Sequence, residues 1–289
     1  MNLDKWLKNN TCSLKGKTVA LTGATGGLGE ELCFYLSSLS ARLILIYRSD
    51  KKAETLKNKI LSRYPSTDIT FIKSDLEDME SVKSATDSLM ELSVDILILN
   101  AGAYSIPRHV SSCGYDNVFT INFISQYYIA KKLAPHIKSV RGKIVAVSSI
   151  AHNYSRSRPA DVDFRTVEPS SLVYGNAKRY ITYALTELLK GEDILSVVHP
   201  GISFTGITNH YPPIIFALIK HPMKWLFMNP KIACLSILLG VFKATPKGFW
   251  IGPALFNVWG KPRMKPLKTA KDEEIKRIFE TAEEIIAKL

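Results

Sequence analysis

A regular alternation of two kinds of segment constrains this chain more than any other feature of its sequence. Short apolar runs rich in β-branched residues alternate with longer amphipathic segments of helical period. Continuous apolar runs of this length are typical of strands buried on both faces of a parallel sheet. The runs lie at residues 18–21, 43–46, 69–72, 96–99, 144–147 and 195–198, and the amphipathic segments lie near residues 29–38, 51–64, 79–91, 114–138 and 172–190. This order predicts an α/β fold with a doubly wound parallel sheet and right-handed crossovers.

The length of the chain is suited to one globular domain. The chain has 289 residues and shows no repeat, low-complexity tract or Gly/Ser linker. We expect a last strand near residues 249–251, a charged helix from about Asp272, and a single domain over residues 1–289. The four cysteines lie far apart and form no CxxC pair. This spacing argues against a disulfide framework or a metal site and is typical of a reducing compartment.

Targeting signals are not evident in the sequence. Residues 1–16 lack the apolar region of a signal peptide. The longest apolar stretch, Ile232–Phe242, is shorter than the roughly 20 residues that span a bilayer. We therefore expect a cytoplasmic location.

A glycine-rich segment directly follows the first apolar run. Glycines there allow a tight turn and a close backbone approach to a pyrophosphate, which the start of the next helix attracts through free N–H groups. The spacing fits both TGxxxGxG and TGxxGxxG. The residues proposed to bind a dinucleotide in this turn are Thr22, Gly23, Gly26, Gly27, Leu28 and Gly29. The segment therefore predicts a Rossmann-type sheet.

The residues after the second apolar run bear on the choice between NAD and NADP. Arg48 stands directly after this run, and a guanidinium pairs well with a 2′-phosphate. Asp50 follows two residues later and is the competing interpretation, as a ribose ligand, although it is better suited to capping the next helix. We therefore expect NADP(H) as the cofactor.

Four polar features occur in order along the middle of the chain. Asn100, Ala101 and Gly102 end the fourth run, Asn122 lies in a helical segment, and Ser148–Ser149 end the fifth run. Tyr174 and Lys178 are four residues apart, so they share one helix face. An ammonium near a phenol favours the phenolate and lowers the phenol's pKa, which allows proton exchange with a substrate oxygen. A serine hydroxyl such as that of Ser149 steadies the developing charge on that oxygen.

These features resemble those of the short-chain dehydrogenase/reductase family over residues 14–258, and in particular its retinol-dehydrogenase-like branch. The resemblance implies that Asn122, Ser149, Tyr174 and Lys178 are catalytic, with Tyr174 as the acid or base and Ser149 preferred over Ser148. It also implies cofactor contacts for the following residues: Asp75, Leu76, Asn100, Ala101, Gly102, Tyr174, Lys178, Pro200, Gly201, Ile202 and Thr205. The sequence has Leu99 where the family more often has asparagine, a mild departure.

The segment 205–247 is where this family places its variable substrate lid. It combines apolar and aromatic residues with lysines, and residues 194–271 contain no Asp or Glu. These features indicate either a lid over a lipophilic pocket or a peripheral membrane contact. His152 is a candidate pocket residue, although a solvated loop position suits it better. Arginine is nearly absent from the basic stretch, so no nucleic-acid partner is expected.

The sequence thus predicts an NADP(H)-dependent oxidoreductase that interconverts a small-molecule ketone or aldehyde with an alcohol, on a steroid-like or retinoid-like substrate. The resemblance also implies a homodimer through the helices near 114–138 and 172–190. Two alternatives stay open at this point. One is a sugar-nucleotide epimerase, which the Asn-Ala-Gly segment and the chain length oppose. The other is a catalytically inactive nucleotide sensor or scaffold, which the complete set of four catalytic residues opposes.

Overall fold

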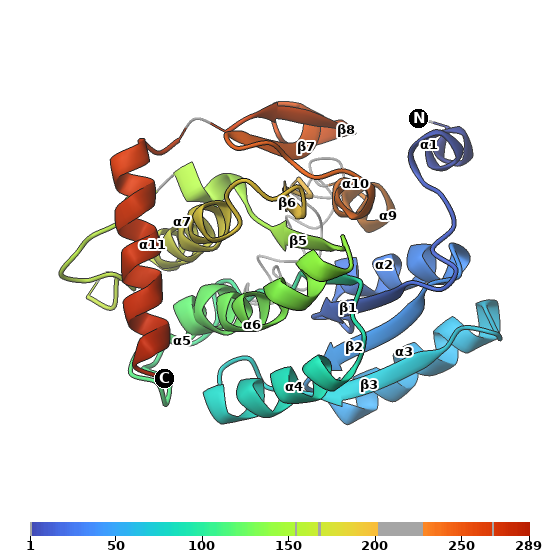
Figure 1. Ribbon diagram of the computed structural model, residues 1–289, viewed down its shortest axis with the longest axis horizontal. Helices are drawn as coiled ribbons and strands as arrows, with labels where there is room; N and C mark the ends of the chain where they lie inside the picture. Colours follow the sequence, from blue (N-terminus) through green and yellow to red (C-terminus); the bar gives the residue numbers. More distant parts are fainter. Residues whose placement is uncertain (1, 154, 167–168, 202–227, 268) are drawn as a thin grey trace, which may run out of the picture.

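One continuous sheet forms the centre of the molecule (Figure 1). The computed structural model describes residues 2–153, 155–166, 169–201, 228–267 and 269–289. The sheet has eight strands in the order β3-β2-β1-β4-β5-β6-β7-β8, and only the β7–β8 pair is antiparallel. The strands are β1 (Thr18–Thr22), β2 (Arg42–Tyr47), β3 (Ile69–Lys73), β4 (Ile96–Leu99), β5 (Lys143–Val147), β6 (Leu195–Val198), β7 (Phe249–Leu255) and β8 (Trp259–Pro266). The predicted doubly wound fold is confirmed.

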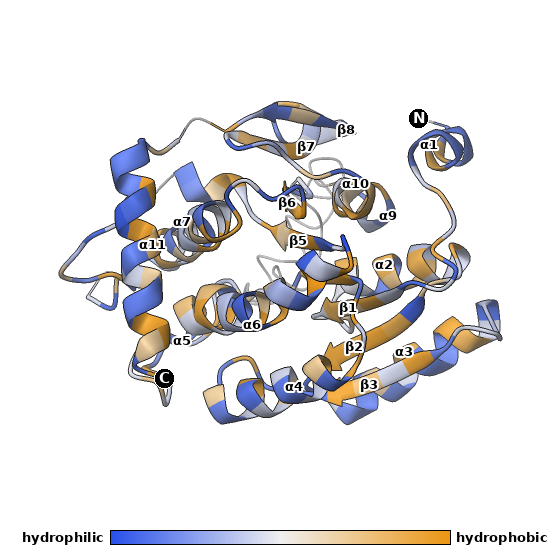
Figure 2. Ribbon diagram, in the orientation of Figure 1, coloured by the Kyte–Doolittle hydropathy of each residue, from blue (hydrophilic) through white to orange (hydrophobic). Residues whose placement is uncertain are grey.

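Helices cover both faces of the sheet and bury its apolar side chains (Figure 2). The helices are α1 (Leu3–Asn10), α2 (Gly27–Ser38), α3 (Asp50–Arg63), α4 (Met79–Glu91), α5 (Asn117–Phe119), α6 (Ser125–Ser139), α7 (Ser170–Leu188), α9 (Pro230–Ala233), α10 (Leu235–Phe242) and α11 (Asp272–Ala287). Apolar residues of α1, α2, α3 and α10 share one core with the sheet, and those of α4, α6, α7 and α11 share the other. The strands are therefore buried on both faces, as their uninterrupted apolar runs require.

Two elements were not expected from the sequence. The short helix α1 has no long apolar stripe, although Trp6 is buried. Strand β8 carries Pro262 and Pro266, which disfavour strand structure in the interior of a sheet. Because β8 is the edge strand, its outer side has no neighbouring strand, and prolines can be accommodated there without the loss of hydrogen bonds between inner strands.

The C-terminal helix α11 lies across α6 and α7 (Figure 1). Its side chains Ile275, Ile278 and Ile285 are buried in the core shared with those helices. Ion pairs reinforce the contact, with Glu274 bound to Arg179 of α7 at 2.8 Å. The helices that the resemblance offered as a dimer face are thus covered by the chain itself, so dimerisation through that face would have to displace α11.

The described part of the predicted lid belongs to the body of the protein. Residues 235–241 of α10 are buried against the sheet, since the helix is apolar around most of its circumference. The remaining lid residues, 205–227, lie outside the described residues. Within the part of the chain that the structure describes, no helix is both long enough and apolar enough to cross a bilayer.

Candidate active site

The glycine-rich turn joins β1 to α2 at the carboxyl end of the sheet. Gly23 has a φ of +67°, and a Cβ there would lie 2.8 Å from the Ala101 Cα. A Cβ on Gly29 would lie only 2.2 Å from the carbonyl oxygen of Gly23. Neither contact is tolerable for a side chain, so the turn can close only with glycine at both positions. Gly26 is the N-cap of α2 and makes no side-chain cap hydrogen bond, and Gly27 and Leu28 begin the helix. The first N–H groups of a helix have no partner within it and can bind an anion.

Thr22 and Asn100 fix this turn to the neighbouring strand. The hydroxyl of Thr22 accepts hydrogen bonds from the backbone N–H groups of Asn100 and Ala101, both at 3.0 Å. The Asn100 amide donates to the carbonyl oxygens of Thr22 and Gly23. The side chains of both residues therefore hold the turn in its shape through hydrogen bonds to the backbone.

Arg48 and Asp75 meet beyond the carboxyl ends of β2 and β3. The Arg48 guanidinium lies 3.8 Å from the Asp75 carboxylate, and both side chains are largely exposed. The competing residue, Asp50, is bound elsewhere. Its carboxylate accepts hydrogen bonds from Lys73 at 2.5 Å and from the Tyr47 hydroxyl at 3.0 Å, and the Lys73 bond in particular lowers its pKa. Asp50 occupies the first turn of α3, whose N-cap is Ser49. Leu76, next to Asp75, is buried in the core.

The two serines at the end of β5 point in different directions. Ser148 is buried, and its hydroxyl shares a hydrogen bond of 2.6 Å with Thr182 of α7. Ser149 is only partly buried, and its hydroxyl makes a hydrogen bond with Tyr174. Ser149, the serine that the family resemblance favours, is thus the less buried of the two.

Tyr174 has a pKa opposite to the one expected from its sequence spacing to Lys178. Burial raises the pKa of Tyr174 to about 12, and the hydrogen bond with Ser149 opposes this only in part. The Lys178 Nζ lies 5.6 Å from the centre of the Tyr174 ring and donates a hydrogen bond to the Val147 carbonyl at 3.0 Å. Tyr104 packs edge-on against the same ring at 5.1 Å between centroids. The net shift of the Tyr174 pKa is therefore upward, whereas its spacing to Lys178 predicts a lowered value.

Lys178 and Asn122 come together beside Gly102. A Cβ on Gly102 would lie 2.7 Å from the Asn122 Oδ1 and 3.5 Å from the Lys178 Nζ, so only glycine fits between them. Lys178 is almost fully buried, and this burial lowers its pKa to about 8. The Asn122 Oδ1 is buried and has no hydrogen-bond partner among the described residues. An unpartnered oxygen beside a buried ammonium is suited to a bound water or ligand hydroxyl.

The backbone around Asn122 forms a π-helical turn, Thr120–Ile124, between α5 and α6. The Asn122 amide nitrogen donates to the carbonyl oxygens of Val118 and Ala103, both at 2.8 Å. These two bonds fix the direction of Oδ1. π-Helical turns of this kind occur frequently at functional sites.

Comparison with known proteins agrees with this geometry. Residues 17–159 match the family model described as short chain dehydrogenase. The chain is 31% identical over 215 residues to the short-chain dehydrogenase TIC 32 A of Brassica napus, covering 68% of this chain and 67% of the relative. The chain belongs to the short-chain dehydrogenase family. Members of this family are oxidoreductases.

Two further proteins show how far the similarity extends. Retinol dehydrogenase 12 of Mus musculus is 27% identical over 220 residues, covering 72% of this chain and 70% of that protein. A short-chain dehydrogenase from Sphingobium yanoikuyae, solved in complex with NADPH, has a TM-score of 0.59 at 20% identity. The match covers 78% of this chain and 83% of that one and establishes likeness of fold.

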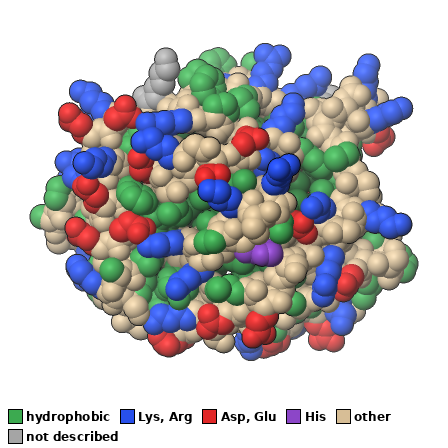
Figure 3. All heavy atoms as spheres, viewed as in Figure 1, with side chains coloured by type: hydrophobic (Ala, Val, Ile, Leu, Met, Phe, Trp, Pro, Cys, Tyr) green, Lys and Arg blue, Asp and Glu red, His purple; other side chains and the backbone are tan. Residues whose placement is uncertain are grey.

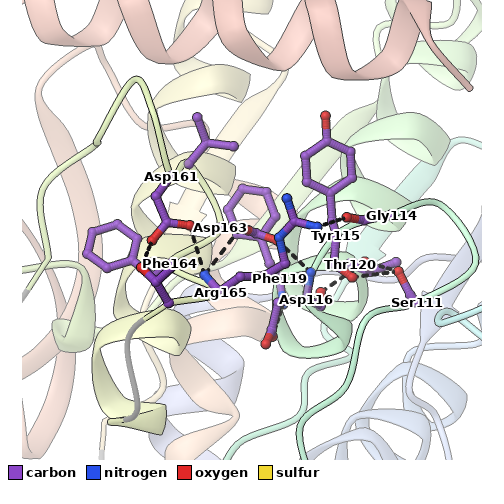
Figure 4. Close-up of polar contacts among 12 residues, drawn as sticks. Ser111, Gly114, Tyr115, Asp116, Phe119, Thr120, Asp161, Asp163, Phe164 and Arg165 are labelled. Carbon is purple, nitrogen blue, oxygen red and sulfur yellow. Dashed lines mark hydrogen bonds and ion pairs between the residues drawn. The ribbon is translucent and has the colours of Figure 1, made fainter.

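A polar network that the sequence did not predict connects the elements that carry the candidate catalytic residues. Figure 4 shows Asp163 and Arg165 facing the segment that leads into α5. The buried Asp163 carboxylate accepts a hydrogen bond of 2.6 Å from the backbone N–H of Asp116. Asp116 in turn caps α5 by accepting from the N–H groups of Val118 and Phe119. Asp163 therefore positions the short helix whose Val118 carbonyl holds Asn122.

The same loop also holds α7. Asn176, between Tyr174 and Lys178, donates from its amide to the Val162 carbonyl. One loop, residues 161–165, thus contacts both the helix with the tyrosine and lysine and the turn with Asn122. In the sequence, Asn176 was visible inside the Tyr-Gly-Asn-Ala-Lys run, but no local pattern distinguishes Asp163 from Asp161.

His152 is buried, not solvated as its loop position indicated. Its side chain is 0% exposed, and its ring centroid lies 5.2 Å from that of Trp250. The Trp250 ring in turn stacks on the ring of His199. Burial lowers the pKa of His152 to about 4, so the ring is neutral at physiological pH. His152 is therefore part of the packing below the site.

The loop after β6 closes the described part of the site. Gly201 has a φ of +85°, and a Cβ there would lie 2.8 Å from the Val258 carbonyl oxygen and 2.9 Å from Pro253. Pro200 and Gly201 are thus held against the β7–β8 hairpin. Ile202 and Thr205, the predicted carboxamide contacts, lie outside the described residues.

Proposed function

We propose that this dehydrogenase interconverts a ketone or aldehyde with an alcohol, using NADP(H). The observation that carries the proposal is the meeting of Ser149, Tyr174, Lys178 and Asn122 at the carboxyl ends of β4 and β5. Ser149 bonds Tyr174, and Lys178 and Asn122 converge beside Gly102. Groups that can polarise a carbonyl and transfer a proton to its oxygen are what this reaction needs.

The residues at the sheet edge fit a dinucleotide. The turn at Gly23 and Gly29 brings backbone, without side chains, to the start of α2, where a pyrophosphate would bind. The unpartnered Asn122 Oδ1 and the remaining N–H groups of Lys178 would face a ribose and an ordered water. Ala101 and Gly102 would line the nucleotide side, next to Asn100. When bound, the nicotinamide supplies or accepts the hydride.

Side chains of the protein would supply the proton that the carbonyl oxygen receives. With a pKa raised to about 12, Tyr174 holds its proton at neutral pH, which is the form that donates to the oxygen of a carbonyl. Ser149 would hold that oxygen beside the Tyr174 hydroxyl. The positive charge on Lys178, buried and 5.6 Å from the ring centre, would stabilise the phenolate left behind. Asn122 would hold a water through which Lys178 exchanges protons with solvent.

Arg48 supports NADP(H) rather than NAD(H). Its guanidinium is largely exposed at the end of β2, while Asp50 is bound by Lys73 and Tyr47. An exposed guanidinium at this position suits a 2′-phosphate, and Asp75, which lies 3.8 Å from it, would accept from the adenine. A neighbour of the same fold was solved with NADPH, which is consistent with this assignment.

The substrate is proposed to be lipophilic, of steroid or retinoid type. The basis is the similarity to a retinol dehydrogenase and the apolar, basic character of residues 205–247. We propose the same segment for a peripheral contact with a membrane surface on the cytoplasmic side. Because α11 covers the usual dimer face, a homodimer is proposed only through another surface.

The test is a substrate screen that follows NADPH absorbance with sterols, retinoids and small aldehydes, each paired with the corresponding alcohol. We expect turnover of at least one lipophilic carbonyl with NADPH and slower turnover with NADH. A protein that binds NADPH tightly but turns over no carbonyl or alcohol would contradict the proposal and favour a sensor.

A further inference from the structure

The hairpin formed by β7 and β8 exposes an unusual amount of apolar surface. Of the eight large hydrophobic side chains that are exposed among the described residues, five belong to this hairpin: Phe249, Leu255, Phe256, Trp259 and Met264. At its turn, Leu255 is 58% exposed and Phe256 is 84% exposed. Scattered apolar residues need no explanation, but a cluster on one element marks an interaction surface.

The turn itself is strained in a way that presents this surface. Phe256 has a φ of +51° and Asn257 a φ of +58°, as in a two-residue hairpin turn that favours Asn and Gly. A bulky aromatic residue in the left-handed region costs free energy that glycine would avoid. Phe256 gains nothing from burial in return, since its ring is almost entirely in solvent. A phenylalanine at this position is explained if its ring becomes buried when the protein binds a partner.

Cations flank the apolar turn. Lys261 and Arg263 on β8 are exposed, and together with Lys5 of α1 they line a groove of about 310 Å³ between α1 and β8. Trp6 and several asparagines complete the groove, and none of the residues that line it carries a carboxylate. Asp4 is the acid nearest in sequence, on the exposed side of α1. Figure 3 shows hydrophobic side chains at the top of the molecule, over the hairpin, flanked by Lys and Arg.

The edge strand β8 is poorly suited to pairing with a strand of another protein. Pro262 and Pro266 have no N–H to donate, and the cations between them would be brought close to a partner backbone. A lipid surface needs no backbone pairing. It offers an apolar layer for Phe256 and Leu255 and anionic headgroups for Lys261 and Arg263.

We infer that the β7–β8 hairpin docks on an anionic lipid surface, with Leu255 and Phe256 entering the apolar layer and the α1–β8 groove holding headgroup phosphates. This names a surface for the membrane contact that is part of the proposed function, but it requires no catalytic activity. The hairpin also touches the site, because the Asn257 carbonyl bonds the His199 ring at 2.9 Å, directly before Pro200–Gly201. Docking would therefore place the loop after β6 next to the bilayer, from which a lipophilic substrate would come.

The experiment is sedimentation of the full-length protein with vesicles of phosphatidylcholine, with and without about one third phosphatidylserine, at low and high salt. We expect binding to the anionic vesicles that weakens with salt. Phe256→Gly relieves the strained turn, so it should keep or raise the melting temperature while weakening binding about tenfold. Met90→Ala, which removes an apolar side chain of α4 that is 58% exposed, is the control and should bind normally.

A second pair of variants tests the charges. Arg263→Glu should weaken binding to anionic vesicles by at least about fivefold, since each surface cation contributes to that attraction. Lys57→Glu, an exposed charge reversal on α3, should have little effect. Absence of binding by the unmodified protein, or binding that neither hairpin variant weakens, would overturn the inference. So would a change from dimer to monomer in Phe256→Gly without loss of lipid binding, because the hairpin would then be a contact between copies.

The outcome is separable from the proposed function. Carbonyl turnover without vesicle binding would remove only the lipid surface. Vesicle binding without turnover of any substrate would remove only the oxidoreductase assignment.

Discussion

The two ends of the candidate site are built in different ways. On the side proposed to bind adenosine, the candidate recognition groups are exposed: the side chains of Arg48 and Asp75 are 69% and 41% accessible and lie 3.8 Å apart. On the side proposed to be catalytic, Asn122 is 0% and Lys178 is 2% exposed, and both are fixed by backbone hydrogen bonds. The difference shows what each task requires. A charge that recognises a phosphate can stay hydrated and adjust, whereas groups that move a proton need a fixed direction and a shifted pKa.

The buried side of this comparison predicts the largest effect. Tyr174→Phe removes the transferable proton but keeps the ring and its packing, so turnover should fall by about 100-fold or more while NADPH affinity stays near normal. Tyr104→Phe, which keeps the edge-on contact with Tyr174, is the matched control and should retain most activity. Steady-state kinetics and a separate NADPH titration measure the two effects. Near-normal turnover in Tyr174→Phe would show that another group transfers the proton.

Lys178 gives the second prediction, through the pH dependence of stability. Its pKa in the folded protein is about 8, below the value near 10.4 of an unfolded lysine. Below pH 8 both states are protonated, and the full cost of burying the charge is present. Above pH 8 the folded state binds fewer protons than the unfolded state, so the free energy of unfolding should rise, by about 2 kcal/mol at pH 9.5, relative to Lys178→Met. Urea denaturation of both proteins from pH 7 to 9.5 measures this, and parallel curves would contradict the buried lysine.

Arg48 tests the exposed side. Arg48→Ala should weaken NADPH binding about 10–100-fold, the range of a lost charge-assisted contact, and leave NADH binding unchanged. The control is Arg42→Ala, at the other end of β2, where the arginine pairs with Asp68 at 3.1 Å and should not affect either cofactor. Dissociation constants for both cofactors decide the matter. Equal affinity for NADH and NADPH in the unmodified protein would end the NADP(H) assignment.

Asp163 tests whether the buried side depends on long-range positioning. In Asp163→Asn, the amide NH2 group can face the Asp116 N–H, which would then lack an acceptor. The free energy of unfolding should therefore fall by about 1–3 kcal/mol. Turnover should fall about tenfold with the NADPH dissociation constant unchanged, because α5 and Asn122 would shift. Asp161→Asn, on the same loop but bonded to Thr166 and Arg165, is the control. If both variants behave alike, the loop has only a structural role.

The smallest effect is expected at Asp50. Its carboxylate already accepts from Lys73 and Tyr47 on the surface, so Asp50→Asn should change NADH and NADPH affinities by less than about twofold. Isothermal titration with each cofactor measures this. A marked loss of NADH affinity would restore Asp50 as the ribose ligand and weaken the contrast drawn from Arg48.

Much of the adenosine side could be read from local sequence. The apolar runs located the first six strands. Gly29 is required by contacts within the turn that follows β1, and Gly23 by its positive φ there as well as by Ala101 after β4. Arg48 could be placed because it directly follows β2. The candidate catalytic residues could also be proposed from the sequence, since Tyr174 and Lys178 occur at helical spacing after a pair of serines. The environment of Tyr174 could not be predicted in this way: the spacing predicted a lowered pKa for Tyr174, and burial raises it.

The sequence by itself determined the alternation of strands and helices, the glycine turn and the order of the polar residues. These depend on periodicity and on neighbours a few positions apart. Tertiary structure alone decided that Asp116 meets Asp163 across 47 residues, that Glu274 of α11 meets Arg179 across 95, and that His152 is buried while Phe256 is not. Burial and long-range pairing depend on which elements pack together. A pKa follows from burial, so it too is decided only when the chain has folded.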